Sequence, residues 1–85
     1  MEIILEPLFI EEFKNCPLDF QEQFRKAYQI LKIVDHPLYI KGVKHSISNP
    51  QLFKLTIDLS RVALYYDGKK VKIVCFLFNK FRLGS

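Results

Sequence analysis

Three strand patterns follow one another closely in the second half of the chain, at residues 51–58, 61–66 and 71–78. Apolar and polar side chains alternate in them, which is typical of strands that bury one face. The second and third patterns are separated by Asp67-Gly68, a dipeptide that strongly favours a two-residue hairpin turn. The chain is therefore expected to form an antiparallel sheet with one buried face.

Two-residue turns also predict the register of this sheet. Across the hairpin turn, Leu64 is expected opposite Val71. With Leu59-Ser60 as a second turn of two residues, Asp58 is expected opposite Arg61. Both registers place one set of apolar side chains on the same face, namely Leu55, Ile57, Val62, Leu64, Val71 and Ile73. We expect the helices to cover this face.

The first part of the chain predicts a strand and two helices. Residues 2–5 suit a strand buried on both faces, and Pro7 is expected to open a short helix. A longer helix should begin near Asp19, which with Glu22 resembles a capping box, and should end before Asp35-His36-Pro37. Its apolar stripe consists of Phe20, Phe24, Ala27, Tyr28, Leu31 and Val34.

Residues 38–50 contain several turn-forming residues and predict a loop, with a short extended piece near residues 43–47. The expected fold is α+β: an N-terminal strand, then two antiparallel helices packed on one face of an antiparallel sheet, in the order βααβββ. Eighty-five residues suffice for one domain, so residues 1–85 are expected to form a single unit without repeats.

Composition excludes several classes of protein. Cys16 and Cys75 lack metal-ligand or disulfide spacing, and we interpret both as reduced core residues. The sequence shows no carboxylate pair, metal-ligand cluster, Gly-rich phosphate loop or Ser/His/Asp pattern, which disfavours metal-dependent hydrolysis and nucleotide-driven chemistry, so no metal and no cofactor is predicted. The chain has no apolar run of the roughly 20 residues that span a membrane and no signal peptide, which favours a cytoplasmic protein with no membrane partner. Gly84-Ser85 has the appearance of a cloning remnant.

Positive charge is concentrated in the second part of the chain. Residues 36–85 hold nine cations and two acids, a net charge of +7, whereas residues 1–35 hold four cations and seven acids, a net charge of −3. Such a lopsided field favours contact with a polyanion or with an acidic protein. Nucleic acid is the first candidate.

The predicted sheet face that points away from the helices combines cations with aromatic rings. It collects Lys54, Arg61, Lys70, Lys72, Tyr65, Phe76 and Phe78. Cations can hold phosphates and rings can stack on bases, so this composition suits an RNA surface. Three alternatives remain open: the lysines are simply solvated, Arg61 pairs with Asp58 across the strands, and the two phenylalanines are covered by the C-terminal tail or by a partner protein.

His45 follows Lys44 in the predicted loop, where an imidazole could transfer protons during phosphodiester cleavage. The alternative is an ordinary loop histidine without a catalytic role. His36, at the end of the longer helix, is expected to be a surface or capping residue.

The order of elements, read together with the segment PQLFKLTIDLSRVALYYDG at residues 50–68, resembles the RelE/ParE superfamily of bacterial toxins. The most telling features are Arg61 at the start of a strand with Tyr65 behind it, the His36-Pro37 break, and the basic residues at 41–44. The resemblance implies a type II toxin that is neutralised by a cognate antitoxin. In the RelE-like branch, it implies a metal-independent endoribonuclease that cuts mRNA on the ribosome.

The resemblance also suggests roles for individual residues. Arg61 matches the phosphate-binding arginine of the RelE-like branch. Lys44 and Lys54 fall near the pair of basic residues in that branch, and Lys80 or Arg82 approximates the arginine of its last strand. Phe81 stands where that branch tends to have a basic residue, and no tyrosine or histidine follows Phe78. These departures favour the ParE-like alternative, a DNA gyrase poison, or a non-catalytic protein-binding module of the same fold.

The predicted site therefore has two parts. The candidate catalytic residues are Arg61, Lys54, Lys44 and His45. The candidate RNA-binding residues are Lys41, Tyr65, Lys72, Phe76, Lys80 and Arg82.

Overall fold

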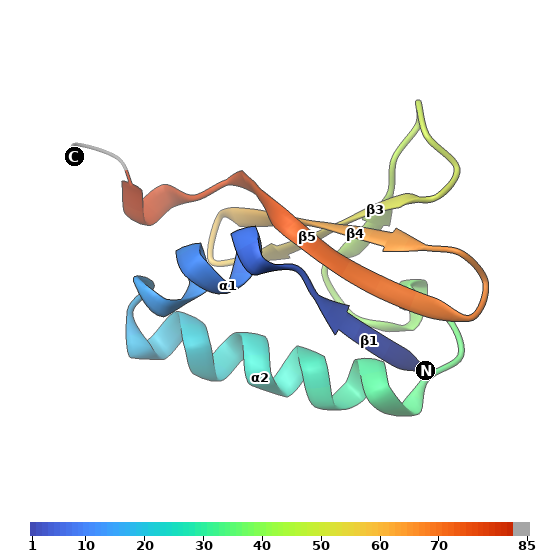
Figure 1. The fold of residues 1–85 in the computed structure, drawn as a ribbon, viewed down its shortest axis with the longest axis horizontal. Helices are drawn as coiled ribbons and strands as arrows, with labels where there is room; N and C mark the ends of the chain where they lie inside the picture. The colour runs from blue at the N-terminus through green and yellow to red at the C-terminus, as the bar shows by residue number, and fades with distance from the viewer. Residues whose placement is uncertain (83–85) are drawn as a thin grey trace.

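Five strands, two α-helices and two short 3-10 helices make up the computed structural model, which describes residues 1–82 (Figure 1). In chain order they are β1 (Glu2–Leu5), α1 (Pro7–Lys14), α2 (Leu18–Ile33), η1 (Pro37–Tyr39), β2 (Val43–His45), β3 (Leu52–Ile57), β4 (Ser60–Tyr66), β5 (Lys70–Phe78) and η2 (Lys80–Arg82). The predicted α+β class and the order of strand, two helices and antiparallel strands are confirmed. The short extended piece expected in the loop is β2.

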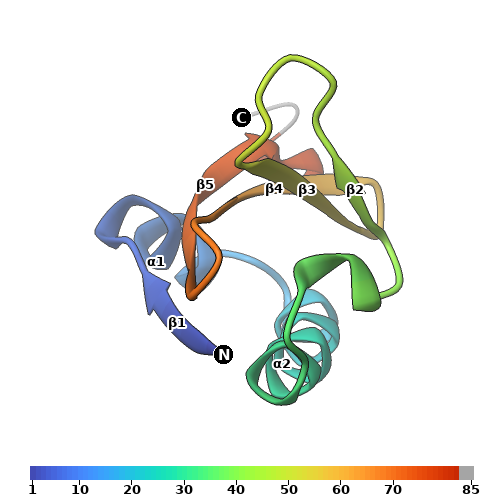
Figure 2. The same ribbon diagram turned by 90° about the vertical axis from the view of Figure 1, so that its right-hand side faces the viewer.

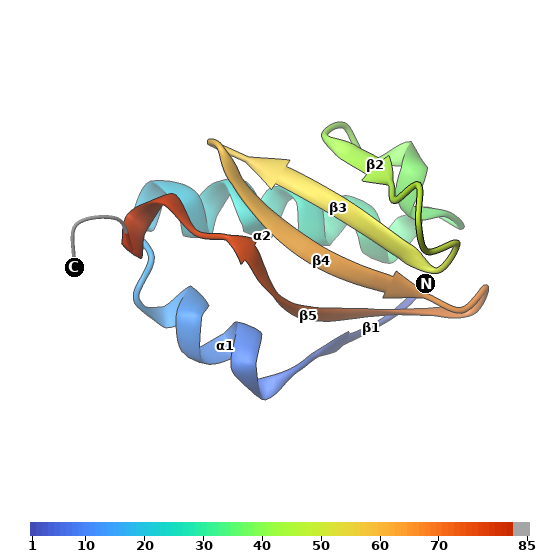
Figure 3. The ribbon, with the colours of Figure 1, turned by 90° about the horizontal axis from the view of Figure 1, so that it is seen from above.

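The strands form one sheet in the order β1-β5-β4-β3-β2. Strands β2 to β5 are antiparallel, as was predicted for β3, β4 and β5, whereas β1 pairs in parallel with β5, with Ile3 opposite Val71. The sheet curves around α2, which lies across its inner side (Figure 2). Helix α1 continues from the end of β1 and lies beside the second half of β5 (Figure 3).

The helices begin and end close to the boundaries predicted from the proline positions. Pro7 occupies the first turn of α1, and α2 ends at Ile33, just before Asp35-His36-Pro37. The predicted capping box is wrong: the residue before α2 is Pro17, and no side chain caps this end. Asp19 already lies inside the first turn, where helical dihedrals prevent it from acting as an N-cap but its charge still favours the helix dipole.

Both predicted registers are shifted by two residues. Leu64 lies opposite Ile73 instead of Val71, and the turn between β3 and β4 is Asp58-Leu59, with positive φ angles of 47° and 71° at its two residues. Two consecutive left-handed residues match the twist of a tight hairpin. Because side chains alternate with a period of two, a shift of two does not by itself move any residue to the other face. The six predicted core-face side chains are buried, as expected: Leu55, Ile57, Val62, Leu64, Val71 and Ile73.

Two residues of β5 depart from their predicted faces: Phe76, and Cys75, which was expected in the core but pairs with Ala63 and is only partly buried. A register shift between Ala63 and Leu64 leaves an extra residue in β5, so the alternation reverses and Phe76 pairs with Val62 on the helix side. Its ring lies 5.3 Å from that of Phe9 and 5.6 Å from that of Phe20, measured between ring centres. The prediction that Phe76 lies on the outer face is therefore wrong, and its ring joins the two helices to the sheet.

Candidate nucleic-acid interface

A shallow basic hollow lies on the face of the sheet that points away from α2. It has a volume of about 290 Å³ and is lined by Lys44, Lys54, Thr56 and Arg61. We call it the basic hollow. Strand pairing brings its residues together: Lys44 of β2 lies opposite Lys54 of β3, and Thr56 of β3 lies opposite Arg61 of β4. Three cations from three neighbouring strands therefore converge on one place.

The buried neighbours of these cations explain why the cations point outward. Val43, Leu55 and Val62 follow or precede them in their strands and lie in the core. Alternation then directs the next side chain in each strand to the opposite face. Lys44 and Arg61 are exposed and Lys54 is partly buried. The core pattern thus builds the basic hollow without any special local structure.

Arg61 keeps its guanidinium free for a ligand. Its Cζ lies 5.8 Å from the centre of the Phe78 ring, a cation–π contact that a second register shift makes possible by placing Phe78 opposite Arg61. Within residues 1–82, Arg61 forms no ion pair, and the carboxylate of Asp58 pairs with Lys80 instead, at 2.9 Å between Nζ and Oδ2. The alternative of an Arg61–Asp58 pair is therefore wrong. A guanidinium with its donors unused can bind both oxygens of a phosphate.

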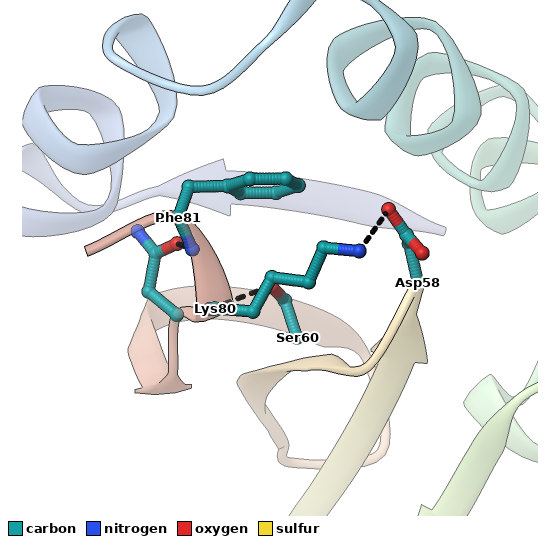
Figure 4. A network of polar contacts seen from close by, with 5 residues as sticks. Asp58, Ser60, Lys80 and Phe81 are labelled. Carbon is teal, nitrogen blue, oxygen red and sulfur yellow. Dashed lines mark hydrogen bonds and ion pairs between the residues drawn. The ribbon is translucent and has the colours of Figure 1, made fainter. Parts of the chain in front are cut away.

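Lys80 was predicted to contact RNA, but its side chain holds the C-terminal segment in place (Figure 4). Besides the ion pair with Asp58, its backbone N–H donates to the Oγ of Ser60 at 3.2 Å, and its Nζ lies 5.3 Å from the ring centre of Phe81. Phe81 in turn meets the ring of Phe20 edge-on at 5.6 Å between centres. Arg82 ends η2, and its side chain lies outside the part of the chain that the structure describes, so that prediction stands as made.

Tyr65 and Lys72 share a second, larger hollow at the β4–β5 hairpin. Its volume is about 500 Å³, and its lining also includes Gln51, Lys70 and Asp67. Tyr65 is 37% exposed and lies opposite Lys72 on the same face as Arg61. Hydrogen bonds from the backbone N–H groups of Lys70 and Lys69 lower the pKa of Asp67, so the turn stabilises the charged carboxylate. This hollow offers a ring with two ammonium groups beside it.

The structure places His45 away from the basic hollow. His45 belongs to β2, the short extended piece expected in this loop, and pairs with Phe53, so it points to the opposite face from Lys44. Its ring stacks on that of Phe53 at 4.7 Å between centres, and its Nε2 lies 2.7 Å from the carbonyl oxygen of Pro50. Of the four predicted catalytic residues, the sheet therefore brings together three and separates the histidine. The imidazole of His36 accepts the N–H of Leu38, so His36 is a capping residue, one of the two roles predicted, but it caps the start of η1 and not the end of α2.

The remaining predicted contacts lie elsewhere. Lys41 precedes β2 and lines a different hollow, which also includes Lys26 of α2. Phe76 is partly buried against the core, as described above, and its ring packs on those of Phe9 and Phe20. Thr56 was not predicted as a site residue, although its place between Lys54 and Asp58 in the strand pattern already put it on the outer face. Lys26 was not predicted as a site residue either, because nothing in the sequence shows which side of α2 lies near β3.

Within residues 1–82 the structure contains no group of three or more His, Cys, Asp or Glu side chains that could hold a metal ion. None of the described helices is both long enough and apolar enough to cross a bilayer. Comparisons with protein-family models, with curated proteins and with solved structures found no match.

Proposed function

We propose that this chain is the cytoplasmic toxin of a type II toxin–antitoxin pair and that it acts as a ribosome-associated endoribonuclease on mRNA. The observation that carries the proposal is the basic hollow, in which Lys44, Lys54 and the uncommitted Arg61 converge on an open sheet face. Three cations in one hollow match the charge of a phosphodiester backbone. The resemblance to the RelE/ParE superfamily supplies the reaction class, and its cognate antitoxin is the second proposed partner.

Each residue of the basic hollow has a distinct task in this proposal. When a ribose 2′-hydroxyl attacks the neighbouring phosphate, it gives its proton to water, and the new bond from the 2′-oxygen to phosphorus forms as the bond from phosphorus to the 5′-oxygen of the next nucleotide breaks. The 5′-oxygen leaves as a hydroxyl after taking a proton from water, and a 2′,3′-cyclic phosphate remains. The transition state gains negative charge on the phosphate oxygens. The forked donors of Arg61 stabilise that charge, while the ammonium groups of Lys44 and Lys54 hold the backbone on either side. Loss of one such donor typically slows an enzyme by about 100-fold to 1,000-fold.

The hollow at the β4–β5 hairpin extends the same surface. The ring of Tyr65 offers a platform for a base, and Lys70 and Lys72 lie where the next phosphates would pass. Tyr65 is four residues from Arg61 along β4, which corresponds to about 13 Å at 3.3 Å per residue. The surface is therefore long enough for a single-stranded segment instead of a single nucleotide.

The position of His45 favours a second candidate function. No imidazole or carboxylate among the described residues lines the basic hollow, so this part of the molecule offers charge without an acid–base pair of the usual kind. A ParE-like toxin that poisons DNA gyrase through protein contacts, or a non-catalytic binding module, requires no such pair.

Two measurements separate these candidates. A purified translation system with a defined mRNA should yield cleaved message with the wild-type chain, detected by primer extension, and Arg61→Ala should reduce the cleavage rate at least about 100-fold. Arg25→Ala is the matched control, since it removes an equal charge from the exposed surface of α2. Equal cleavage rates for wild type and Arg61→Ala contradict the nuclease proposal. Induced expression that stalls DNA replication while translation continues supports the gyrase candidate instead.

A further inference from the structure

A third hollow adjoins the basic hollow at the edge of β3. It has a volume of about 370 Å³ and lies between α2 and β3, with Lys26 and Gln23 on the helix side and Lys41 on the segment before β2. We call it the edge hollow. The edge hollow and the basic hollow share one lining residue, Thr56. The two depressions therefore meet at the end of β3.

The segment just before β2 lies against the end of β3 at this junction. Strand β2 starts at Val43, so the last residues of β3 extend beyond its regular pairing, and the N–H of Thr56 donates to the carbonyl of Gly42 at 3.0 Å. Gly42 lines the edge hollow and has no side chain that could fill it. Thr56 is exposed and lines both hollows, so a chain lying in the basic hollow reaches the edge hollow by way of Thr56.

The charge of the edge hollow is also positive. Lys26 and Lys41 are both exposed, and neither forms an ion pair with any residue from 1 to 82. The carboxylate in the lining, that of Asp58, is neutralised by its ion pair with Lys80 at 2.9 Å. Two ammonium groups thus remain for an outside ligand, although Lys26 belongs to the acidic part of the sequence.

We infer that a single-stranded RNA held at Arg61 continues over Thr56 into the edge hollow, where Lys26 and Lys41 bind its next phosphates. This inference rests on the proposed function. Cations spaced along a groove follow the phosphate backbone without regard to base identity. The path turns from the outer face around the sheet edge to the helix side, a bend that a stiff double helix, with a persistence length of about 150 base pairs for DNA, would not follow. The occupant is therefore single-stranded.

Binding of fluorescently labelled single-stranded RNA, measured by anisotropy over a range of salt concentrations, tests the inference. One oligonucleotide of about 3 nucleotides fills the basic hollow alone, and one of about 12 nucleotides reaches the edge hollow as well. Lys26→Ala and Lys41→Ala should each weaken binding of the longer RNA about fivefold at about 0.1 M salt. Each should also make the slope of the logarithm of the binding constant against the logarithm of the salt concentration smaller in magnitude by about 0.7. Neither substitution should change binding of the shorter RNA. Arg25→Ala, which removes the neighbouring cation of α2, should leave both affinities unchanged.

The outcomes separate this inference from the proposed function. If the wild type binds RNA and Arg61→Ala weakens it, but Lys26→Ala behaves like Arg25→Ala with the longer RNA, the path over Thr56 is wrong and the proposed function stands. If the lysine substitutions weaken the binding of both oligonucleotides equally, the loss reflects the overall charge of the protein and not contacts in the edge hollow, and the inference is also overturned. If the wild type binds neither RNA, both ideas fail. Far-ultraviolet circular dichroism confirms that each exposed-lysine variant is folded.

Discussion

The contact of Gly42 with β3 permits a sharp prediction of stability. Gly42 has φ +92°, and a Cβ atom built there would lie 2.9 Å from the backbone oxygen of Thr56. Gly68 has nearly the same dihedral, φ +96°, but its Cβ would meet nothing within 4 Å. Replacing each glycine by alanine therefore imposes the same left-handed backbone cost, while a steric clash arises at one position only.

The size of the difference follows from these two environments. The left-handed conformation costs a residue with a Cβ about 1–2 kcal/mol, and this cost is common to Gly42→Ala and Gly68→Ala. At Gly42, the added methyl group must push β2 away from a backbone oxygen that cannot rotate aside. Overpacking of this kind costs about 1–3 kcal/mol, and stretching the bond from the Thr56 N–H to the Gly42 carbonyl costs about a further 0.5 kcal/mol. We expect Gly42→Ala to be less stable than Gly68→Ala by at least about 1.5 kcal/mol.

Urea unfolding followed by far-ultraviolet circular dichroism measures this difference. With an m-value of about 1–2 kcal/mol/M for a small domain, the midpoint of Gly42→Ala should lie at least about 0.7 M below that of Gly68→Ala. In thermal unfolding the gap should be about 6 °C or more. Equal midpoints for the two variants would refute the close approach of Gly42 to β3 and, with it, the register between β2 and β3.

Three further predictions concern the core, the hairpin turn and the cysteines. Phe76→Ala should lower the free energy of unfolding by about 3 kcal/mol, because the Phe76 ring packs against rings from both helices. Phe78→Ala, at a position that is 36% exposed, should lower it by less than about 1 kcal/mol. Equal losses in urea unfolding would contradict the reversed alternation in β5. Because the pKa of Asp67 is lowered in the folded protein, its charged form stabilises the fold at pH values above its unfolded pKa, and this contribution is lost as the pH falls through the folded pKa. The stability advantage of the wild type over Asp67→Asn should therefore be present at neutral pH and shrink in acid. An advantage that does not depend on pH would argue against the turn geometry. Burial raises the pKa of the Cys16 thiol, so Cys16 should react with a maleimide more slowly in the folded protein than in urea. Mass spectrometry after digestion identifies the modified residue. Equal reaction rates in the two conditions would place the thiol at the surface.

Sequence patterns predicted the fold better than the site. Alternation is a property of the chain alone, so the core face of β3, β4 and β5 followed from residues such as Leu55 and Leu64, and even a register error of two residues kept them on that face. Pro7 and Pro37 predicted helix boundaries because a fixed ring acts locally. The parallel pairing of β1 with β5 could not be predicted in this way, since it joins opposite ends of the chain.

The errors at the site have two physical origins. The register shifts in β5 depend on how the strand fits between β4 and α1, and they moved Phe76 inward while placing Phe78 beside Arg61. Tertiary partners decided the rest: Asp58 was expected to compete for Arg61, but the C-terminal segment brought Lys80 to it instead. His45 and Lys44 are adjacent in β2, within the extended piece expected near residues 43–47, so alternation along the strand separates their side chains; the pairing with β3 shows which face each one takes.

The central claim is that RNA binds on the open face of the sheet around Arg61. Titration of the nitrogen-15-labelled protein with a single-stranded RNA, followed by two-dimensional NMR, tests it directly. The account predicts progressive shifts of the amide signals of Lys44, Lys54 and Arg61, while those of the outward residues of α1 stay in place. Saturable binding that leaves these three signals unmoved, with shifts confined to another surface, would contradict it.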